Sequence, residues 1–392
     1  MAPAFAEPMD ANWGYTARHQ IEFRQERSFR ANSWSNRLKK APKVFEAIIV
    51  ALPETAGSAL YGMVDVLAST GTLWRQLVGD DPGTALIQPR IASPSREPFR
   101  CGNDIPVMPD LAIEDVSKAD ILILPELWLA PSDDMRERYA ELKGWICRLH
   151  RSGCIVYSAC SGAVLLAATG LLKGREATSH WAYADLFRNS FPEVRFNPEP
   201  NLVFADPAGR IVTAGGTTSW HDLAIHIISR HCGPGEALRI AKVYLLKLHG
   251  EGQLPYASLV RRQPHADSVV RHAETWLAEN FREPHAVAAA VAACGVPERS
   301  PKRRFKTATG TTLISYVQNL RIEDAKRLLE RAEMPFDDIA LGIGYENTAF
   351  FRRLFKRCTG LTPGQYRQMF RPIVRAASAP NAKRKTVKAS AN

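Results

Sequence analysis

The chain has 392 residues, of which 45% are hydrophobic and 23% are charged, and a net charge of +11. This composition is typical of a globular protein with two or three domains. The absence of an apolar run of about 18 residues and of a secretory leader predicts no membrane span and a cytoplasmic location. The seven cysteines follow neither disulfide nor metal-ligand spacing, so we expect no metal site.

The positive charge is concentrated at one end of the chain. Residues 261–392 contain 24 lysines and arginines against 12 acidic residues, whereas residues 1–260 contain 27 against 28. A near-neutral body with a basic C-terminal third is typical of a nucleic-acid binder that has a separate sensing or enzymatic part.

Residues 1–43 show no sustained hydrophobic period and are interpreted as an N-terminal extension, which either packs on the next domain or binds DNA non-specifically.

Residues 44–250 alternate apolar strands with helical patterns, which predicts an α/β domain with a parallel sheet covered by helices on both faces. The glycine-rich turn at residues 213–218 has no phosphate-loop or GxGxxG pattern, so we expect no cofactor. The expected strands span residues 44–52, 120–124 and 153–158, and the expected helices span residues 59–67, 135–150, 164–168, 220–231 and 238–248. The last of these is a candidate dimer helix.

A cysteine, Cys160, stands between the third strand and its helix in the sequence SACSGA (residues 158–163). On such a turn a side chain projects into the crevice at the carboxyl end of the strand, beside a helix N-terminus that favours a thiolate. His180 follows in the sequence ATSHW (residues 177–181). This pair resembles the PfpI type of amidotransferase-like domain, with a flavodoxin-like fold, over roughly residues 44–232.

Two departures from the enzymes of that family argue against catalysis. Ala59 stands where they carry an acidic residue on the first helix, and Glu126 and Leu127 stand where they carry glycines whose N–H groups approach an oxyanion. We therefore expect no enzyme activity, and interpret Cys160 and His180 as walls of a ligand pocket. The alternatives are a buried structural cysteine and a cysteine-dependent amidohydrolase that uses both residues.

Aromatic side chains near the predicted strand ends indicate what such a pocket would bind. Trp181 and Trp220 present faces that attract cations, and Glu126 or Asp222 would supply a carboxylate. The hypothesis is a small nitrogenous metabolite. The alternative is that the tryptophans are ordinary core or dimer contacts. The residues of this predicted pocket are Cys160, His180, Trp181, Trp220 and Glu126.

Residues 251–266 are rich in turn formers and are interpreted as a linker to an all-α domain at residues 267–371. After a helix at residues 268–280, residues 285–306 form a helix-glycine-helix pattern that contains two prolines. We expect Ser300 to cap its second helix and Pro301 to occupy the first helical position, because proline is tolerated there. Residues 372–392 are expected to form a basic, disordered tail.

A helix at residues 313–331 is expected to connect two helix-turn-helix units. At 1.5 Å per residue it would be ~28 Å long, which sets two recognition helices about one DNA turn apart. In the second unit, residues 336–341 form a short helix, glycines break it, and Asn347 caps a helix over Thr348–Lys356.

The string GYENTAFFRRLFKRCTGLTPGQYR (residues 344–367) resembles the second helix-turn-helix of the AraC/XylS family. Arginine and lysine suit guanine edges and asparagine suits adenine. The expected base contacts are Arg299, Lys302 and Arg303 in the first unit and Asn347, Thr348, Arg352 and Arg353 in the second.

A PfpI-like domain followed by an AraC-like domain resembles the GlxA-type regulators. The resemblance implies a sequence-specific transcription regulator that acts as a homodimer, with double-stranded DNA and RNA polymerase as partners. Control is expected to come from a small metabolite bound in the α/β domain, or from dimerisation through it.

Overall fold

The computed structural model describes residues 43–378 apart from residues 82, 131, 132, 134, 261–264 and 298. The predicted N-terminal extension and the end of the basic tail therefore lie outside the described residues. None of the described helices is both long and apolar enough to cross a membrane.

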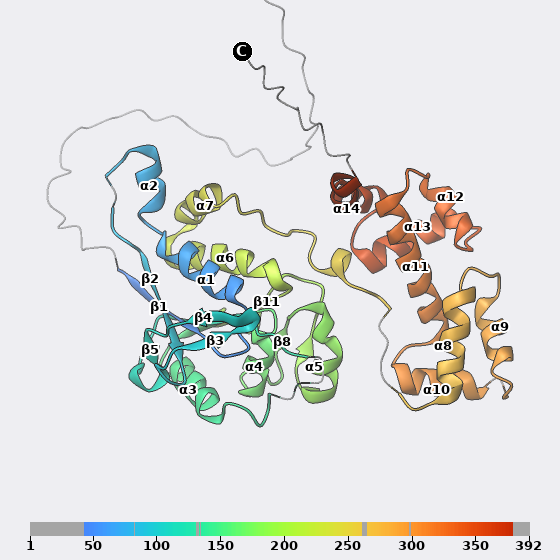
Figure 1. Cartoon of the computed structure of the whole chain (residues 1–392), viewed down its shortest axis with the longest axis horizontal. Helices are drawn as coiled ribbons and strands as arrows, with labels where there is room; N and C mark the ends of the chain where they lie inside the picture. Colours follow the sequence, from blue (N-terminus) through green and yellow to red (C-terminus); the bar gives the residue numbers. More distant parts are fainter. Residues whose placement is uncertain are drawn as a thin grey trace, which may run out of the picture. The chain divides into compact units, whose positions relative to one another are not determined.

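A seven-stranded sheet forms the centre of the α/β part, which is coloured blue to green in Figure 1. The strand order is β10-β11-β7-β6-β1-β2-β5. All neighbouring strands are parallel except β10 and β11, which are antiparallel. This sheet confirms the predicted fold class. Its strands are β1 (Phe45–Val50), β2 (Ile87–Ser93), β5 (Leu111–Ala112), β6 (Ile121–Leu124), β7 (Ile155–Ala159), β10 (Leu202–Phe204) and β11 (Ile211–Ala214).

Alternate side chains of the central strands enter two separate cores, one on each face of the sheet. From β1, Ile48 and Val50 pack with helices α3 (Ala140–Arg151) and α4 (Gly162–Ala168). Ala47 and Ile49 pack on the opposite face with α1 (Gly57–Ala68) and α6 (Trp220–Cys232). Burying each large apolar side chain stabilises the fold by about 1.5–3 kcal/mol, which explains the continuous apolar runs in the sequence.

Two helices of this part, α3 and α7, depart most from the predicted bounds. α3 begins at Ala140, not at residue 135, because Tyr139 has a left-handed φ of 54°. α7 spans Pro234–Val243, not residues 238–248: Pro234 occupies its first turn, and Leu245 has a φ of 53° beyond its end. The periodic pattern identified both helices but could not locate these backbone breaks.

The C-terminal part consists of helices in two helix-turn-helix units. α8 and α11 have the predicted bounds, whereas α14 continues beyond residue 371 with Pro372 inside it. The helices are α8 (Ser268–Asn280), α9 (Ala286–Ala293), α10 (Arg299–Thr309), α11 (Leu313–Arg331), α12 (Phe336–Gly342), α13 (Thr348–Thr359) and α14 (Pro363–Ser378).

Each unit has its own hydrophobic core, and α11 contributes to both. Leu313 and Val317 pack in the core of α8, α9 and α10, whereas Ile322, Ala325 and Leu329 pack in the core of α12, α13 and α14. The connecting helix is therefore fixed to both units along its length.

The prediction that Ser300 caps the N-terminus of α10 is wrong. The helix begins at Arg299, so Ser300 already lies in its first turn, where the Ser300 N–H donates to the carbonyl of Pro297 at 2.8 Å. Pro301 remains tolerable because N–H groups in the first turn of a helix have no intrahelical partner. The prolines therefore do not shorten α10, which has 11 residues against 12 in α13.

Candidate functional site

The orientation of α13 is fixed by its cap and its buried face. The Oδ1 of Asn347 accepts a hydrogen bond from the Phe350 N–H at 2.8 Å, as predicted for an N-cap. Phe351 stacks on Phe336 with ring centroids 5.5 Å apart and on Tyr345 at 4.4 Å. The opposite face is exposed. Its residues are Ala349, Phe350, Arg352, Arg353, Lys356 and Arg357.

The predicted base-contacting residues of α13 are not equivalent in the structure. The guanidinium of Arg352 pairs with Asp337 at 2.7 Å and lies over the Phe336 ring at 4.9 Å. Asn347 is engaged as the cap, and Thr348 is half-buried. Arg353 is exposed and forms no ion pair with any residue that the structure describes. Of the four, Arg353 is the exposed charged residue that no ion pair with the described residues already engages.

In the first unit, α10 is held to α8 by an ion pair. Arg304 reaches Asp267 at 2.7 Å, and Asp267 also caps α8 by accepting from the Val269 and Val270 N–H groups. The hydrogen bond from Arg304 is the main reason that the pKa of Asp267 is lowered. The backbone of Arg299 starts the helix, while its side chain lies outside the description. The exposed basic residues that follow are Lys302, Arg303 and Lys306.

The strand-to-helix turn of the α/β part has the strained geometry expected of an elbow. Cys160 has a left-handed φ of 51°. A Cβ on Gly162 would lie 2.2 Å from the Leu124 carbonyl, so only glycine fits there. The turn places the Cys160 thiol 3.4 Å from Oε1 of Glu126, which also accepts a hydrogen bond from the Thr217 hydroxyl at 3.0 Å.

The two ionisable groups of this turn both have raised pKa values. Burial raises the pKa of the Cys160 thiol, and the neighbouring Glu126 carboxyl raises it further. Burial also raises the pKa of Glu126, against the hydrogen bonds from Thr217 and Cys160. The second carboxyl oxygen of Glu126, Oε2, is buried without a hydrogen-bond partner among the described residues. A buried neutral thiol is a poor nucleophile.

The backbone N–H that follows Glu126 is already occupied. Leu127 donates it to the Ser161 hydroxyl at 2.7 Å, whereas an oxyanion hole needs N–H groups aimed at the reacting oxygen. The arrangement thus provides a polar cluster at the carboxyl ends of β6, β7 and β11, in which Cys160 and Glu126 are buried and Thr217 is exposed.

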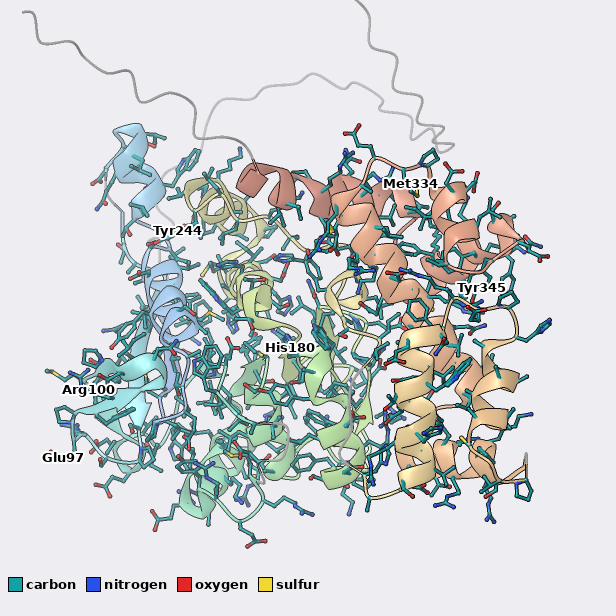
Figure 2. All side chains as sticks on the ribbon, turned by 45° about the vertical axis from the view of Figure 1, so that its right-hand side comes forward. Glu97, Arg100, His180, Tyr244, Met334 and Tyr345 are labelled. Carbon is teal, nitrogen blue, oxygen red and sulfur yellow. The ribbon has the colours of Figure 1, made fainter. Side chains whose placement is uncertain are left out.

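His180 follows β8 (Glu176–Ala177) in the segment that leads to α5 (Ala184–Ser190), as Figure 2 shows. Its Nδ1 accepts from the Ala182 N–H at 3.1 Å, and its ring lies 4.9 Å from that of Trp181. The hydroxyl of Ser179 donates to the Cys160 carbonyl at 2.6 Å, so this segment is attached to the elbow through the backbone.

Trp220 lines a different hollow from the elbow cluster. Its indole packs so closely on α1 that a Cβ on Gly62 would lie 2.5 Å from it. The hollow has a volume of about 470 Å³. Asp222, the other predicted carboxylate, accepts from Nδ1 of His249 at 2.8 Å. The lining of the hollow includes Asp65, Thr218, His221, Tyr244 and His249.

Sequence reasoning missed two residues of this region. Thr217 gave no signal because it lies in a turn, far along the chain from Glu126. Gln253 lies in the predicted linker, yet only 3% of it is exposed. Its side chain accepts from the Trp181 N–H at 3.2 Å and donates to the Ser179 carbonyl at 3.0 Å. A glutamine among turn formers has no pattern that predicts such burial.

Comparisons with known proteins agree with this two-part architecture. Residues 62–230 match the DJ-1/PfpI family, and residues 290–369 match a family of helix-turn-helix domains. The chain is 26% identical over 286 residues to the HTH-type transcriptional regulator CdhR of Pseudomonas aeruginosa, covering 73% of this chain and 83% of that protein. It is 30% identical over 226 residues to the HTH-type transcriptional regulator GlxA of Rhizobium meliloti, covering 56% of this chain and 67% of that protein. Over 106 residues it is 32% identical to the arabinose operon regulatory protein of Salmonella typhimurium, covering 26% of this chain and 37% of that protein.

Proposed function

Because this chain belongs to the GlxA-type transcription regulators, in which a DJ-1/PfpI domain precedes an AraC-type helix-turn-helix domain, we propose that its α10 and α13 read a specific DNA sequence under control of its α/β domain. The observation that carries the proposal is the exposed basic face on each of two helices joined by α11. Each face is fixed by a buried apolar face on its other side.

The DNA contacts divide into two classes. Arg353 and Thr348 in α13, with Arg299, Lys302 and Arg303 in α10, are the proposed base contacts. Arg352 and Asn347 are held by Asp337 and by the cap, so they position the helix and contribute less to base readout. Lys306, Lys356 and Arg357 lie at exposed positions suited to phosphates.

The α/β domain acts as a sensor and not as an enzyme in this proposal. Support comes from the buried, neutral Cys160 and from the Leu127 N–H that is bonded to Ser161. Control passes through a small nitrogenous metabolite or through contact between two copies of the chain. Oε2 of Glu126, which has no hydrogen-bond partner among the described residues, would accept a donor group of such a ligand. The separate hollow that Trp220 lines is a second candidate site, where the indole would attract a cation.

The test uses the full chain and duplexes selected by it from a random DNA library. Sequence-specific binding by a dimer, with RNA polymerase recruited at the bound site, is the expected behaviour. A panel of amines and amino acids should contain a compound that shifts both the thermal midpoint and the DNA affinity. If no sequence is enriched from the library, the DNA-reading proposal is wrong. If sequence is enriched but no compound in the panel changes either property, the ligand part fails and control by dimerisation remains.

A further inference from the structure

One large apolar side chain lies on the basic face of α13 where the fold does not need it. Phe350 is 40% exposed, whereas the neighbouring Phe351 and Phe355 are completely buried. Its ring lies 6.0 Å from that of Tyr345, which is labelled in Figure 2, and part of the side chain remains open to solvent. Exposing a phenylalanine beside four basic residues disfavours solubility without contributing to the core.

The position of Phe350 within the helix is fixed by its own backbone. Its N–H is the group that the Asn347 side chain caps, which places Phe350 in the first turn of α13. In helix-turn-helix proteins, the N-terminal residues of the recognition helix contact the base edges. Arg353 lies one turn further along the same exposed face.

The polar groups around the start of α13 have partners in the fold or are partly covered. Asn347 forms the cap, Thr348 is half-buried, and Arg352 in the second turn is paired with Asp337. The turn therefore presents Ala349 and Phe350, which are exposed apolar groups, toward whatever the helix reads. In the major groove the one apolar feature of a base edge is the 5-methyl group of thymine.

We propose that Phe350 packs on the 5-methyl group of a thymine in the DNA site read by α13 and selects thymine over cytosine there. The inference rests on the proposed function, because it requires α13 to enter the major groove. It adds a specificity-determining residue that carries no charge and forms no hydrogen bond with DNA.

The test removes the methyl group from the DNA and the ring from the protein separately. The full chain first selects duplexes from a random library, and each thymine of the selected site is then replaced singly by deoxyuridine. One replacement should weaken binding of the unaltered protein by about three- to tenfold, the range expected for one buried methyl group. Phe350→Ala should weaken binding to the thymine duplex similarly and should not distinguish it from the deoxyuridine duplex.

Ile373→Ala is the matched control, because Ile373 is a large apolar residue of the same unit with 67% exposure. It should bind both duplexes as the unaltered protein does, and thermal midpoints establish that both variants fold. If no deoxyuridine replacement weakens the unaltered protein, the thymine contact does not exist, although DNA reading stands. If Phe350→Ala weakens both duplexes equally while the unaltered protein still distinguishes them, another residue reads the methyl, and Phe350 serves a protein partner or the fold. Failure to select any sequence contradicts the proposed function itself.

Discussion

The thiol of Cys160 lies 3.4 Å from the carboxyl of Glu126, and the two residues are only 2% and 5% exposed. The first helix has Ala59 at the position where the enzymes of the family carry an acidic residue. In this structure the carboxyl beside the thiol is that of Glu126, in the loop after β6. Because both groups are buried, this carboxyl stabilises the protonated thiol and does not activate it.

The first prediction concerns the pH dependence of stability at Glu126. Its raised pKa means that the folded protein holds this proton more tightly than the unfolded chain does. The stabilisation is complete below the unfolded pKa of about 4.3 and is lost as pH rises through the folded pKa. Glu126→Gln cannot titrate. Its free energy of unfolding, measured in urea, should therefore rise relative to that of the unaltered protein as the pH increases from the unfolded pKa through the raised folded pKa.

Glu97→Gln is the control for this measurement, because Glu97 is exposed. It makes the same change of charge at an exposed position, and the effect specific to Glu126 is the pH dependence that remains after the effect of Glu97→Gln is subtracted. A constant difference for Glu126→Gln would show that the carboxyl has an ordinary pKa in the folded protein.

The second prediction separates the regulator from the amidohydrolase. Cys160→Ala removes one buried sulfur atom, which should cost about 1–2 kcal/mol in the free energy of unfolding. DNA affinity without ligand should stay within about twofold, because the proposed DNA contacts lie on α10 and α13. Anisotropy of a labelled duplex measures this. An amidohydrolase would reveal itself by amide turnover that the unaltered protein shows and the variant lacks.

The third prediction distinguishes two adjacent arginines of α13. Arg353→Ala should weaken binding to the selected site by about 1–3 kcal/mol and weaken non-specific binding far less. Arg352→Ala should have a smaller effect on specificity, because Arg352 is already paired with Asp337. Titrations at several salt concentrations separate base contacts from phosphate contacts. Equal losses on both DNAs for Arg353→Ala would assign that residue to a phosphate.

The fourth prediction concerns the close contact of α1 with Trp220. Gly62→Ala would place a methyl group 2.5 Å from the indole, so the ring must move or the helix must shift, at a cost of about 1–3 kcal/mol. Tryptophan fluorescence and the thermal midpoint should both change. Gly144→Ala in α3 is the control, since its nearest neighbour is the end of Arg148 at 3.5 Å, and it should stabilise by about 0.5–1 kcal/mol. Equal effects of the two substitutions would contradict the contact.

The sequence predicted those elements whose ends are set locally. α8 and α11 have the expected bounds because Asp267 and Thr312 cap them with side chains that a sequence pattern reveals. The predicted start of α10 was wrong because proline is tolerated at several positions in the first turn of a helix. Cys160 and Glu126 were predicted to share a pocket, but the direct contact between them was not predicted, since it depends on the order of β6 and β7 in the sheet.

The double attachment of α11 restricts how the chain can change over evolution. A single residue inserted between Val317 and Ile322 would turn one unit by about 100° about the helix axis relative to the other and displace it by about 1.5 Å. One recognition helix would then face away from the groove that the other occupies. Insertions and deletions should therefore be absent from this segment in functional relatives and confined to loops. A different spacing between the DNA segments that α10 and α13 read would require a different connecting helix, because α11 cannot simply be lengthened.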